Sequence, residues 1–258
     1  RAAPYALADV FGKPLATPIG PSAGPHTQLS QNIISAWLCG GRFIELKTVQ
    51  INDRLVIPRP SIDMTDEGYN VEWSQELSLD QSAHEYVAAW ALVHLLPRIL
   101  GWDRGPAPVA VRPGAVFDLS VGYDLEGIRH PRLTHFLDLM ADASELLEPI
   151  SQAIARHCPQ AADVEIPARV ATSATLSTMH GCPPGEIERM ARYLLEERGL
   201  HTVIKLNPTL LGRDSVREIL HDRLGFTNLD LPESAFEHDL TYPRAVALIT
   251  ALSDTART

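Results

Sequence analysis

The chain of 258 residues is 45% hydrophobic and 21% charged, a balance that predicts a soluble globular protein with one large core or two small ones. It carries 22 Lys and Arg against 32 Asp and Glu, and the formal charge of -10 argues against nucleic acid or an anionic membrane surface as the main partner. Small molecules and other proteins remain as the expected partners.

The sequence shows no membrane or export signal. No apolar run approaches the roughly 20 residues that span a bilayer, and no basic segment followed by an apolar one opens the chain, so we expect a cytoplasmic protein. Cys39, Cys158 and Cys182 are odd in number and far apart. We therefore expect neither a disulfide framework nor a four-thiolate iron–sulfur site within this chain.

Apolar stretches separated by turn residues predict alternating strands and helices after a hairpin or strand entry at 5–20. The expected strands are 40–50, 115–122, 164–170 running on toward residue 174, 202–207, and a weaker one at 227–231. The expected helices are 29–38, 82–100, 133–154 with a new segment from Pro149, 184–198 closed by Gly199, 215–224 and 242–252. Long loops are expected at 51–79 and 101–114.

This alternation favours an α/β fold with a parallel sheet. The sequence lacks both a Gly-x-Gly-x-x-Gly turn after a strand and a Walker-type phosphate loop, so a TIM-type (β/α) barrel is favoured over an open nucleotide-binding sheet. Only five or six β/α units can be counted, whereas a barrel needs eight. We expect 1–258 to be a single, incomplete barrel domain, the N-terminal portion of a longer protein that continues beyond Thr258.

Two stretches carry residues suited to chemistry. The run 174–185 leads a strand into a loop with His180 and Cys182 and then into a helix, whose N-terminus is expected to lower the pKa of the thiol. We expect no metal here, because no other pair of residues has ligand spacing. In the second stretch, Lys205 lies among Val203, Ile204 and Leu206, where an unpaired ammonium would be costly to bury, so a polar or anionic partner is expected.

Two earlier segments extend this pattern. The loop 18–25 consists of small residues and prolines, and its bare backbone would let a flat ligand approach closely. Lys47 and Thr48 end the strand expected at 40–50, and in β/α barrels functional groups lie at the C-terminal ends of strands.

Five segments of the chain together closely resemble the YgfK family, whose members carry the label of selenate reductase subunits. They are residues 17–28, 41–50, 120–127, 177–184 and 204–212. The resemblance covers nearly the whole chain, although nothing in these residues looks like a molybdenum or selenium site. More distantly, the same segments are similar to the flavin-binding barrels of dihydroorotate dehydrogenases and dihydropyrimidine dehydrogenase.

The more distant resemblance implies an FMN site. The residues that it assigns to the cofactor are Ser22, Ala23, Gly24, Lys47, Thr48, Ser120, Thr175, Ser177, Lys205 and Asn207. A positive group near the ring would stabilise a reduced, anionic flavin, which would give Lys205 its anionic partner.

The relatives also carry a cysteine or serine that exchanges a proton with the substrate at the end of the fourth strand. Cys182 matches this residue by chemistry but comes five residues after Ser177, so His180, with an ordinary pKa near 6.5, is the alternative proton donor. Asp124 matches the approximate position of an asparagine that binds the substrate in the relatives. His26 is expected to line the same open end of the barrel.

The resulting hypothesis is a flavin-dependent oxidoreductase domain that moves hydride between a flavin and a small substrate such as a heterocycle. In this family, FAD, NAD(P)H and iron–sulfur clusters are expected only in domains outside this chain, and those electron-transfer domains are its expected partners. A Schiff-base lyase or aldolase that uses Lys205, and a scaffold without cofactor, remain as alternatives.

Overall fold

The computed structural model describes residues 8–52, 62–63, 69–70, 77–102, 115–178, 182–237 and 239–257. His180 and most of the two long loops lie outside these ranges.

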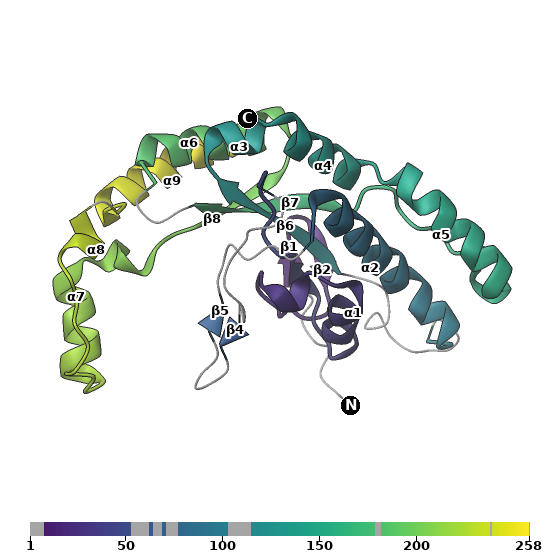
Figure 1. The fold of residues 1–258 in the computed structure, drawn as a ribbon, viewed down its shortest axis with the longest axis horizontal. Helices are drawn as coiled ribbons and strands as arrows, with labels where there is room; N and C mark the ends of the chain where they lie inside the picture. Colours follow the sequence, from purple (N-terminus) through teal and green to yellow (C-terminus); the bar gives the residue numbers. More distant parts are fainter. Residues whose placement is uncertain are drawn as a thin grey trace.

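A parallel sheet of four strands, in the order β3-β6-β7-β8, forms the centre of the molecule (Figure 1). Its strands are β3 (Phe43–Glu45), β6 (Val116–Tyr123), β7 (Ala171–Thr178) and β8 (His201–Lys205). Two small antiparallel pairs accompany it, β1 (Ala8–Val10) with β2 (Lys13–Leu15) and β4 (Ile62–Asp63) with β5 (Tyr69–Asn70).

Helices follow each strand of the sheet, and those seen along the top of Figure 1 form an arch over one side of it. The α-helices are α1 (Ser30–Leu38), α2 (Leu79–Ile99), α3 (Leu125–Arg129), α4 (Pro131–Ala141), α5 (Ser144–His157), α6 (Pro184–Arg192), α7 (Arg213–Arg217), α8 (Ser234–Glu237) and α9 (Tyr242–Ala256). Short 3₁₀ turns are η1 (Pro25–Thr27), η3 (Pro159–Ala161) and η5 (Pro208–Leu211), and π-helical turns η4 (Tyr193–Glu197) and η6 (Glu218–Arg223) extend α6 and α7. Among the helices in the described ranges, none is long and apolar enough to cross a membrane.

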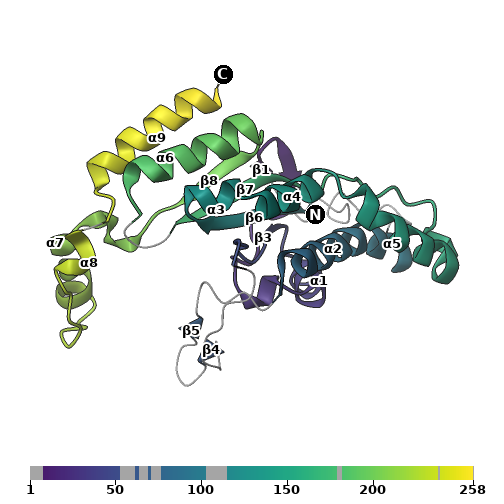
Figure 2. The same ribbon diagram turned by 45° about the horizontal axis from the view of Figure 1, so that its top comes forward.

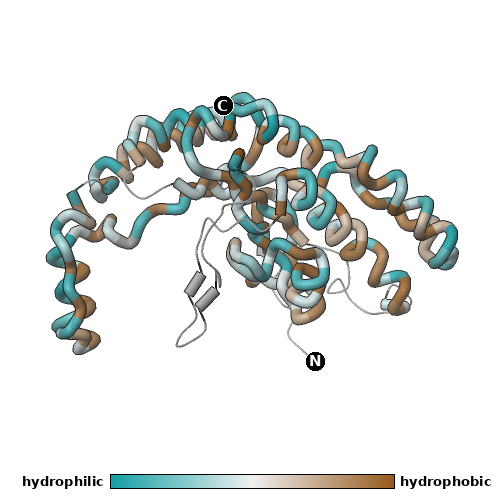
Figure 3. The backbone as a smooth tube through the Cα atoms, viewed as in Figure 1, coloured by the Kyte–Doolittle hydropathy of each residue, from teal (hydrophilic) through white to brown (hydrophobic). Residues whose placement is uncertain are grey.

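The outer face of the sheet is apolar and carries the main core. Ile44, Phe117, Leu119 and Leu176 each have 2% or less of their surface exposed and join one buried cluster with residues of the helices. The ring of Trp90 in α2 meets Phe117 edge to face, with 5.1 Å between ring centroids. Figure 3 shows apolar and polar stretches alternating along the helices of the arch, as expected for helices with one buried side.

The inner face of the same strands is polar. Because successive side chains of a strand point to opposite faces, Glu45, Asp118 and Ser173, which are paired in register, share a face opposite to Leu119. Further along, Thr175 pairs with both Ser120 and Val203, and Ser177 pairs with Lys205. Most of these positions are nevertheless buried, so a row of polar groups lies inside the molecule.

The sheet is curled so that its first and last strands meet across the inner face. The ring of Phe11, in the turn between β1 and β2, stacks on His201 of β8 with centroids 4.9 Å apart and lies 6.4 Å from Phe43 of β3. Lys205 of β8 forms an ion pair with Glu45 of β3, with 3.3 Å between Nζ and Oε1. Flat sheets place strands about 4.8 Å apart, so strands three positions apart could not meet in this way without strong curvature. The sheet is therefore a segment of a barrel wall.

Residues 19–21, which are not a regular strand, lie along the free edge of β3. The amide of Arg42 donates to the carbonyl of Ile19 (2.7 Å), and the amide of Glu45 donates to that of Pro21 (3.1 Å), which is the progression of a parallel pair. A Cβ on Gly20 would lie 1.5 Å from the carbonyl oxygen of Phe43, so only glycine allows this approach. Residues 19–21 thus stand in the position of a barrel strand ahead of β3.

The predicted α/β fold with a parallel sheet is confirmed, but the barrel is not closed in the described residues, and three expected details are wrong. Residues 227–231 form a turn and irregular backbone, not a sixth strand, and 164–170 precede β7 without belonging to it. Pro149 lies inside α5. The break between α4 and α5 is at 142–143 instead, where Asp142 Oδ1 accepts hydrogen bonds from the amide and hydroxyl of Ser144 (3.1 and 2.6 Å).

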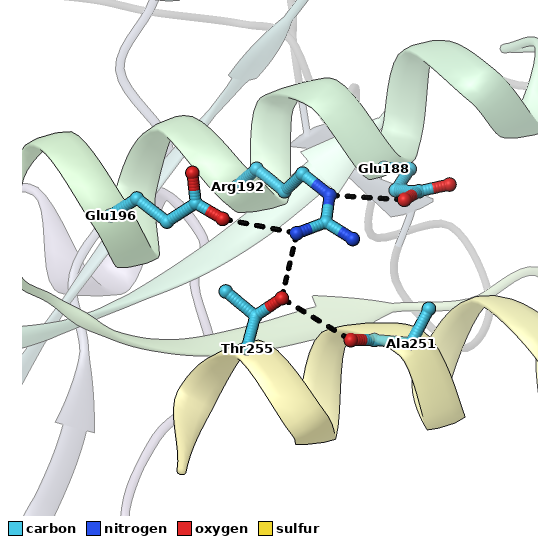
Figure 4. Close-up of polar contacts among 5 residues, drawn as sticks. All are labelled: Glu188, Arg192, Glu196, Ala251 and Thr255. Carbon is cyan, nitrogen blue, oxygen red and sulfur yellow. Dashed lines mark hydrogen bonds and ion pairs between the residues drawn. The ribbon is translucent and has the colours of Figure 1, made fainter. Parts of the chain in front are cut away.

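Between β8 and α9 the chain makes a long excursion, residues 206–241, which projects from the sheet in both views (Figures 1 and 2). Neither α7 nor η6 within it has a buried residue. The chain then returns as α9, which packs on α6 behind the sheet. Arg192 of α6 links the two helices: it donates to Glu188 and Glu196 on its own helix (3.0 Å each) and to the hydroxyl of Thr255 in α9 (2.6 Å), as Figure 4 shows.

Candidate functional site

The C-terminal ends of the strands bring together most of the residues proposed for the cofactor. Ser120, Thr175 and Ser177 lie on the inner face within the register of β6 and β7, and Lys205 follows on β8. Thr48 reaches the same place from the end of β3, with its hydroxyl 2.7 Å from that of Ser120. Residues far apart in sequence thus form one polar surface, as the barrel prediction requires.

Lys47 is fixed in the wall of this surface. Only 2% of the residue is exposed. Its amide donates to the carbonyl of Thr27 (3.2 Å), and its carbonyl accepts from the hydroxyl of the buried Tyr86 in α2 (2.9 Å). The strand end that carries Lys47 is therefore held from both sides.

Glu45 is a central residue of the site that the sequence reasoning missed. Its Oε1 lies 3.3 Å from Lys205 Nζ, and its Oε2 accepts a hydrogen bond from the backbone amide of Ala23 (3.0 Å). Only 8% of Glu45 is exposed, whereas the side chain of Lys205 is 41% exposed. This contact supplies the anionic partner that was expected for Lys205, and it comes from the protein itself.

Asp118 is a second buried acid that the sequence reasoning missed. It is fully buried beside Glu45 in the register and accepts a hydrogen bond from the hydroxyl of Thr175 (2.6 Å). Burial, with a smaller contribution from the Glu45 carboxylate, raises the pKa of Asp118 to about 6, although Ser173, Thr175 and Lys205 oppose the shift. Asp118 therefore changes charge close to neutral pH.

A signal for both acids is present in the sequence. In 116–123, Asp118 and Ser120 alternate with apolar residues, and in 43–50 the polar residues Glu45, Lys47, Thr48 and Gln50 interrupt an otherwise apolar stretch. Such alternation in a strand that is buried on both faces marks an inner face with a polar function. The polar positions of 173–177 follow the same rule.

The small-residue loop lies next to this surface. Gly24 is buried and its amide donates to the hydroxyl of Thr27 (3.1 Å), while Ser22 is exposed. The ring of the exposed His26 lies against Gly24, because a Cβ on that glycine would meet the ring at 2.6 Å. The structure therefore places His26 and the loop together, near the end of β3.

Cys182 has the opposite electrostatics from those expected. Burial, together with the carboxylates of Glu186 and Asp124, raises the pKa of its thiol to about 11. The prediction of a lowered pKa from the helix N-terminus was wrong, because burial and two acidic neighbours outweigh the helix. Cys182 is thus a neutral thiol, the form that can donate a proton.

Two other predicted residues are engaged in structural contacts. The carboxylate of Asp124 caps α3 by accepting from the amide of Gly127 (2.6 Å), and Glu186 accepts from the amide of Leu125 (3.1 Å) in the same turn. Asn207 donates its side-chain amide to the buried Asp239 (3.1 Å), at the base of the excursion 206–241. Within the part of the chain that the structure describes, no group of three or more His, Cys, Asp or Glu side chains is placed to hold a metal ion.

Comparison with known proteins decides the family. A family model described as "Oxidoreductase YgfK, N-terminal TIM-barrel domain" matches residues 2–258. The chain belongs to the YgfK N-terminal domain family. Two proteins named "Putative oxidoreductase YgfK", from Escherichia coli K12 and O157:H7, are each 47% identical to it over 268 residues, and each match covers 96% of the chain.

The chain spans about a quarter of the length of these YgfK relatives, because the matches cover 25% of each of them. Among solved structures, DHODH from Eimeria tenella in complex with ferulenol is similar with a TM-score of 0.41 and 16% identity. That similarity covers 83% of this chain and 63% of the DHODH chain.

Proposed function

We propose that this chain forms the ring-binding part of an FMN site in the oxidoreductase barrel of a longer flavoprotein. The observation that carries the proposal is the position of Lys205 on a curled, polar inner face at the C-terminal ends of parallel strands. The chain has three lysines; Lys205 lies on this inner face, and Lys47 follows β3 two positions after Glu45. Membership of a family described as oxidoreductase supports the reaction class.

The residues present fit a flat ring with acceptor atoms at its edge. Ser120, Thr175 and Ser177 carry hydroxyl groups on this face, and the partly exposed side chain of Lys205 lies on the neighbouring strand. Asp118 Oδ1 is fully buried and no well-formed hydrogen bond reaches it among the described residues, although the nearby hydroxyl of Ser173 lowers the pKa of this acid. Such an unpaired buried atom is typical of a site that water or a ligand completes. The phosphate-binding part is expected outside this chain.

FMN, when bound, would supply hydride transfer to or from a substrate. In that arrangement, the charge of Lys205 would favour negative charge on the ring, and the backbone of the loop at 22–24 would approach its flat face. Cys182, which holds its proton at neutral pH, would donate that proton at Sγ to the substrate. His180 remains the alternative donor. We propose a small heterocyclic substrate on the motif resemblance alone.

Because the relatives are about four times as long as this chain, we propose that electrons pass between this site and later domains of the same polypeptide. The motif resemblance gives those domains FAD, NAD(P)H and iron–sulfur clusters. The whole protein would then connect a reduced pyridine nucleotide to the substrate at the barrel.

The decisive experiment is to purify the full-length protein and measure its FMN content after acid release. We expect about one FMN per chain bound at the barrel in the wild type, and Lys205→Met should weaken its binding about tenfold or more, as expected for loss of a charged contact. Lys13→Met is the matched control, because Lys13 lies in the β1–β2 hairpin, and it should leave binding unchanged. Full-length protein purified without FMN would contradict the proposal and favour a scaffold without cofactor. Equal FMN binding in wild type and Lys205→Met would contradict the placement of the ring at Lys205.

The Schiff-base alternative is less well supported by the structure. An amine that attacks a carbonyl must do so without its proton, whereas the ion pair with Glu45 is made by the protonated form of Lys205. Trapping of a carbonyl substrate on Lys205 by borohydride would revive that alternative.

A further inference from the structure

Glu45 makes two contacts with two different parts of the site. One carboxylate oxygen pairs with the ammonium of Lys205 at 3.3 Å, and the other accepts the amide hydrogen of Ala23 at 3.0 Å. The first contact reaches the far strand of the curled sheet, and the second reaches the small-residue loop. A single side chain therefore joins the two elements that would contact a bound ring from different directions.

Because Glu45 is buried, its carboxylate depends on these two contacts and is held in one position. Glu45 is 8% exposed, and a carboxylate in such a position is costly unless hydrogen bonds and a positive charge compensate it. The backbone of Glu45 is itself fixed, because its amide donates to Pro21 (3.1 Å) and its strand pairs with β6. The carboxylate is thus a rigid point, whereas Lys205 is long, flexible and 41% exposed.

Lys205 needs a fixed anionic partner in order to stay over the inner face. Its strand, β8, is the last strand of the described sheet, and Val203 on the same face of that strand is 38% exposed. A lysine on an exposed strand would otherwise extend into water, because its ammonium is strongly hydrated and its stem has many rotamers.

We propose that Glu45 is the positioning residue of this site, which holds Lys205 over the inner face and the loop at 22–24 against the end of β3 at the same time. The inference rests on the proposed function only in one respect, namely that Lys205 and the loop at 22–24 would contact a flavin ring. The double contact itself is a property of this chain. Glutamine at this position would keep an oxygen for the Ala23 amide and lose the charge for Lys205, and alanine would lose both.

The two variants Glu45→Gln and Glu45→Ala therefore separate the two contacts. In the full-length protein, acetylation of Lys205 by acetic anhydride, followed by mass spectrometry, should become about tenfold faster in both variants. Hydrogen exchange in the peptide that contains Ala23 should become about tenfold faster only in Glu45→Ala. The matched control is Glu188→Gln, which breaks an ion pair with Arg192 on the outer surface and should change neither readout. Circular dichroism checks that each variant is folded.

The binding and the reduction potential of FMN connect Glu45 to the proposed cofactor site. If the wild type holds FMN, both variants should release it about tenfold more easily, and the flavin reduction potential should rise in Glu45→Gln because a negative charge next to the ring is removed. Equal Lys205 acetylation in wild type and both variants, or unchanged exchange of the Ala23 peptide in Glu45→Ala, would overturn the positioning role. Absence of FMN from the wild type would instead overturn the proposed function, and the acetylation and exchange results would still decide about Glu45.

Discussion

Along β6, consecutive residues lie in two different environments. Leu119 points outward into the apolar cluster under the helices, and Ser120 points inward to the polar surface, where its hydroxyl lies 2.7 Å from that of Thr48. Both are almost completely buried, at 2% and 1% exposed. Burial alone therefore does not distinguish a stabilising residue from a functional one in this sheet. The chemistry of the face does.

The largest expected difference between the faces is in stability. Leu119→Ala should lower the free energy of unfolding by about 2–5 kcal/mol, because it leaves a cavity in a packed core. Ser120→Ala should lower it by only about 1 kcal/mol, through the lost contact with Thr48. Urea unfolding followed by tryptophan fluorescence measures both. Equal losses for the two variants would mean that the inner face is also a packed core.

The second expected effect is a pH dependence that belongs to the inner face. Burial raises the pKa of Asp118 to about 6 from 3.8, so the folded chain keeps this proton where the unfolded chain has lost it. The stabilisation is present at low pH and is lost as the pH rises from about 4 to about 6. Relative to the wild type, Asp118→Asn should therefore gain about 1–3 kcal/mol of stability between pH 4 and pH 7.

Urea unfolding at these two pH values tests this expectation. The exposed Asp254→Asn serves as the control, since its side chain is 73% exposed, and should show no such change. A stability difference between Asp118→Asn and wild type that does not vary with pH would mean that the buried acid is ionised throughout.

The smallest expected effect concerns the rate at which the thiol of Cys182, in the loop after β7, is alkylated. Because burial and two carboxylates raise the pKa of Cys182 to about 11, its alkylation by iodoacetamide at neutral pH should be slower than that of the exposed Cys39. Glu186→Gln should accelerate Cys182 severalfold and leave Cys39 unchanged. Mass spectrometry of the labelled peptides gives both rates. If Cys182 reacts as fast as Cys39, the thiol is activated after all.

Much of this arrangement could be predicted from the sequence. Apolar strands alternating with amphipathic helices gave the parallel sheet, and the placement of Lys47, Thr48 and Lys205 at strand ends followed from the geometry of such sheets. The residues that link those positions were missed. Glu45 and Asp118 interrupt apolar strands, which marks a polar face, but their partners Lys205 and Thr175 lie on other strands, so no local pattern reveals which residues they contact.

The errors have similar causes. The thiol of Cys182 was judged from its position at a helix N-terminus, but its pKa depends on burial, on Glu186 and on Asp124, which lies just after β6 at the start of α3. Pro149 was taken as a helix break, although α5 begins five residues earlier at Ser144, whose amide donates to the side chain of Asp142. In both cases, a tertiary or capping contact outweighs the local signal.

The contact of Phe11 with His201 has a consequence for the order in which the chain folds. The two rings belong to residues 190 positions apart in the chain, and Glu45 and Lys205 are 160 positions apart. Contacts between distant parts of a chain form late, because the intervening loop must close before they contribute. During synthesis, the N-terminal hairpin must therefore wait for β8 to emerge. The polar surface would take its final curvature only after the helices had already packed on the other side of the sheet.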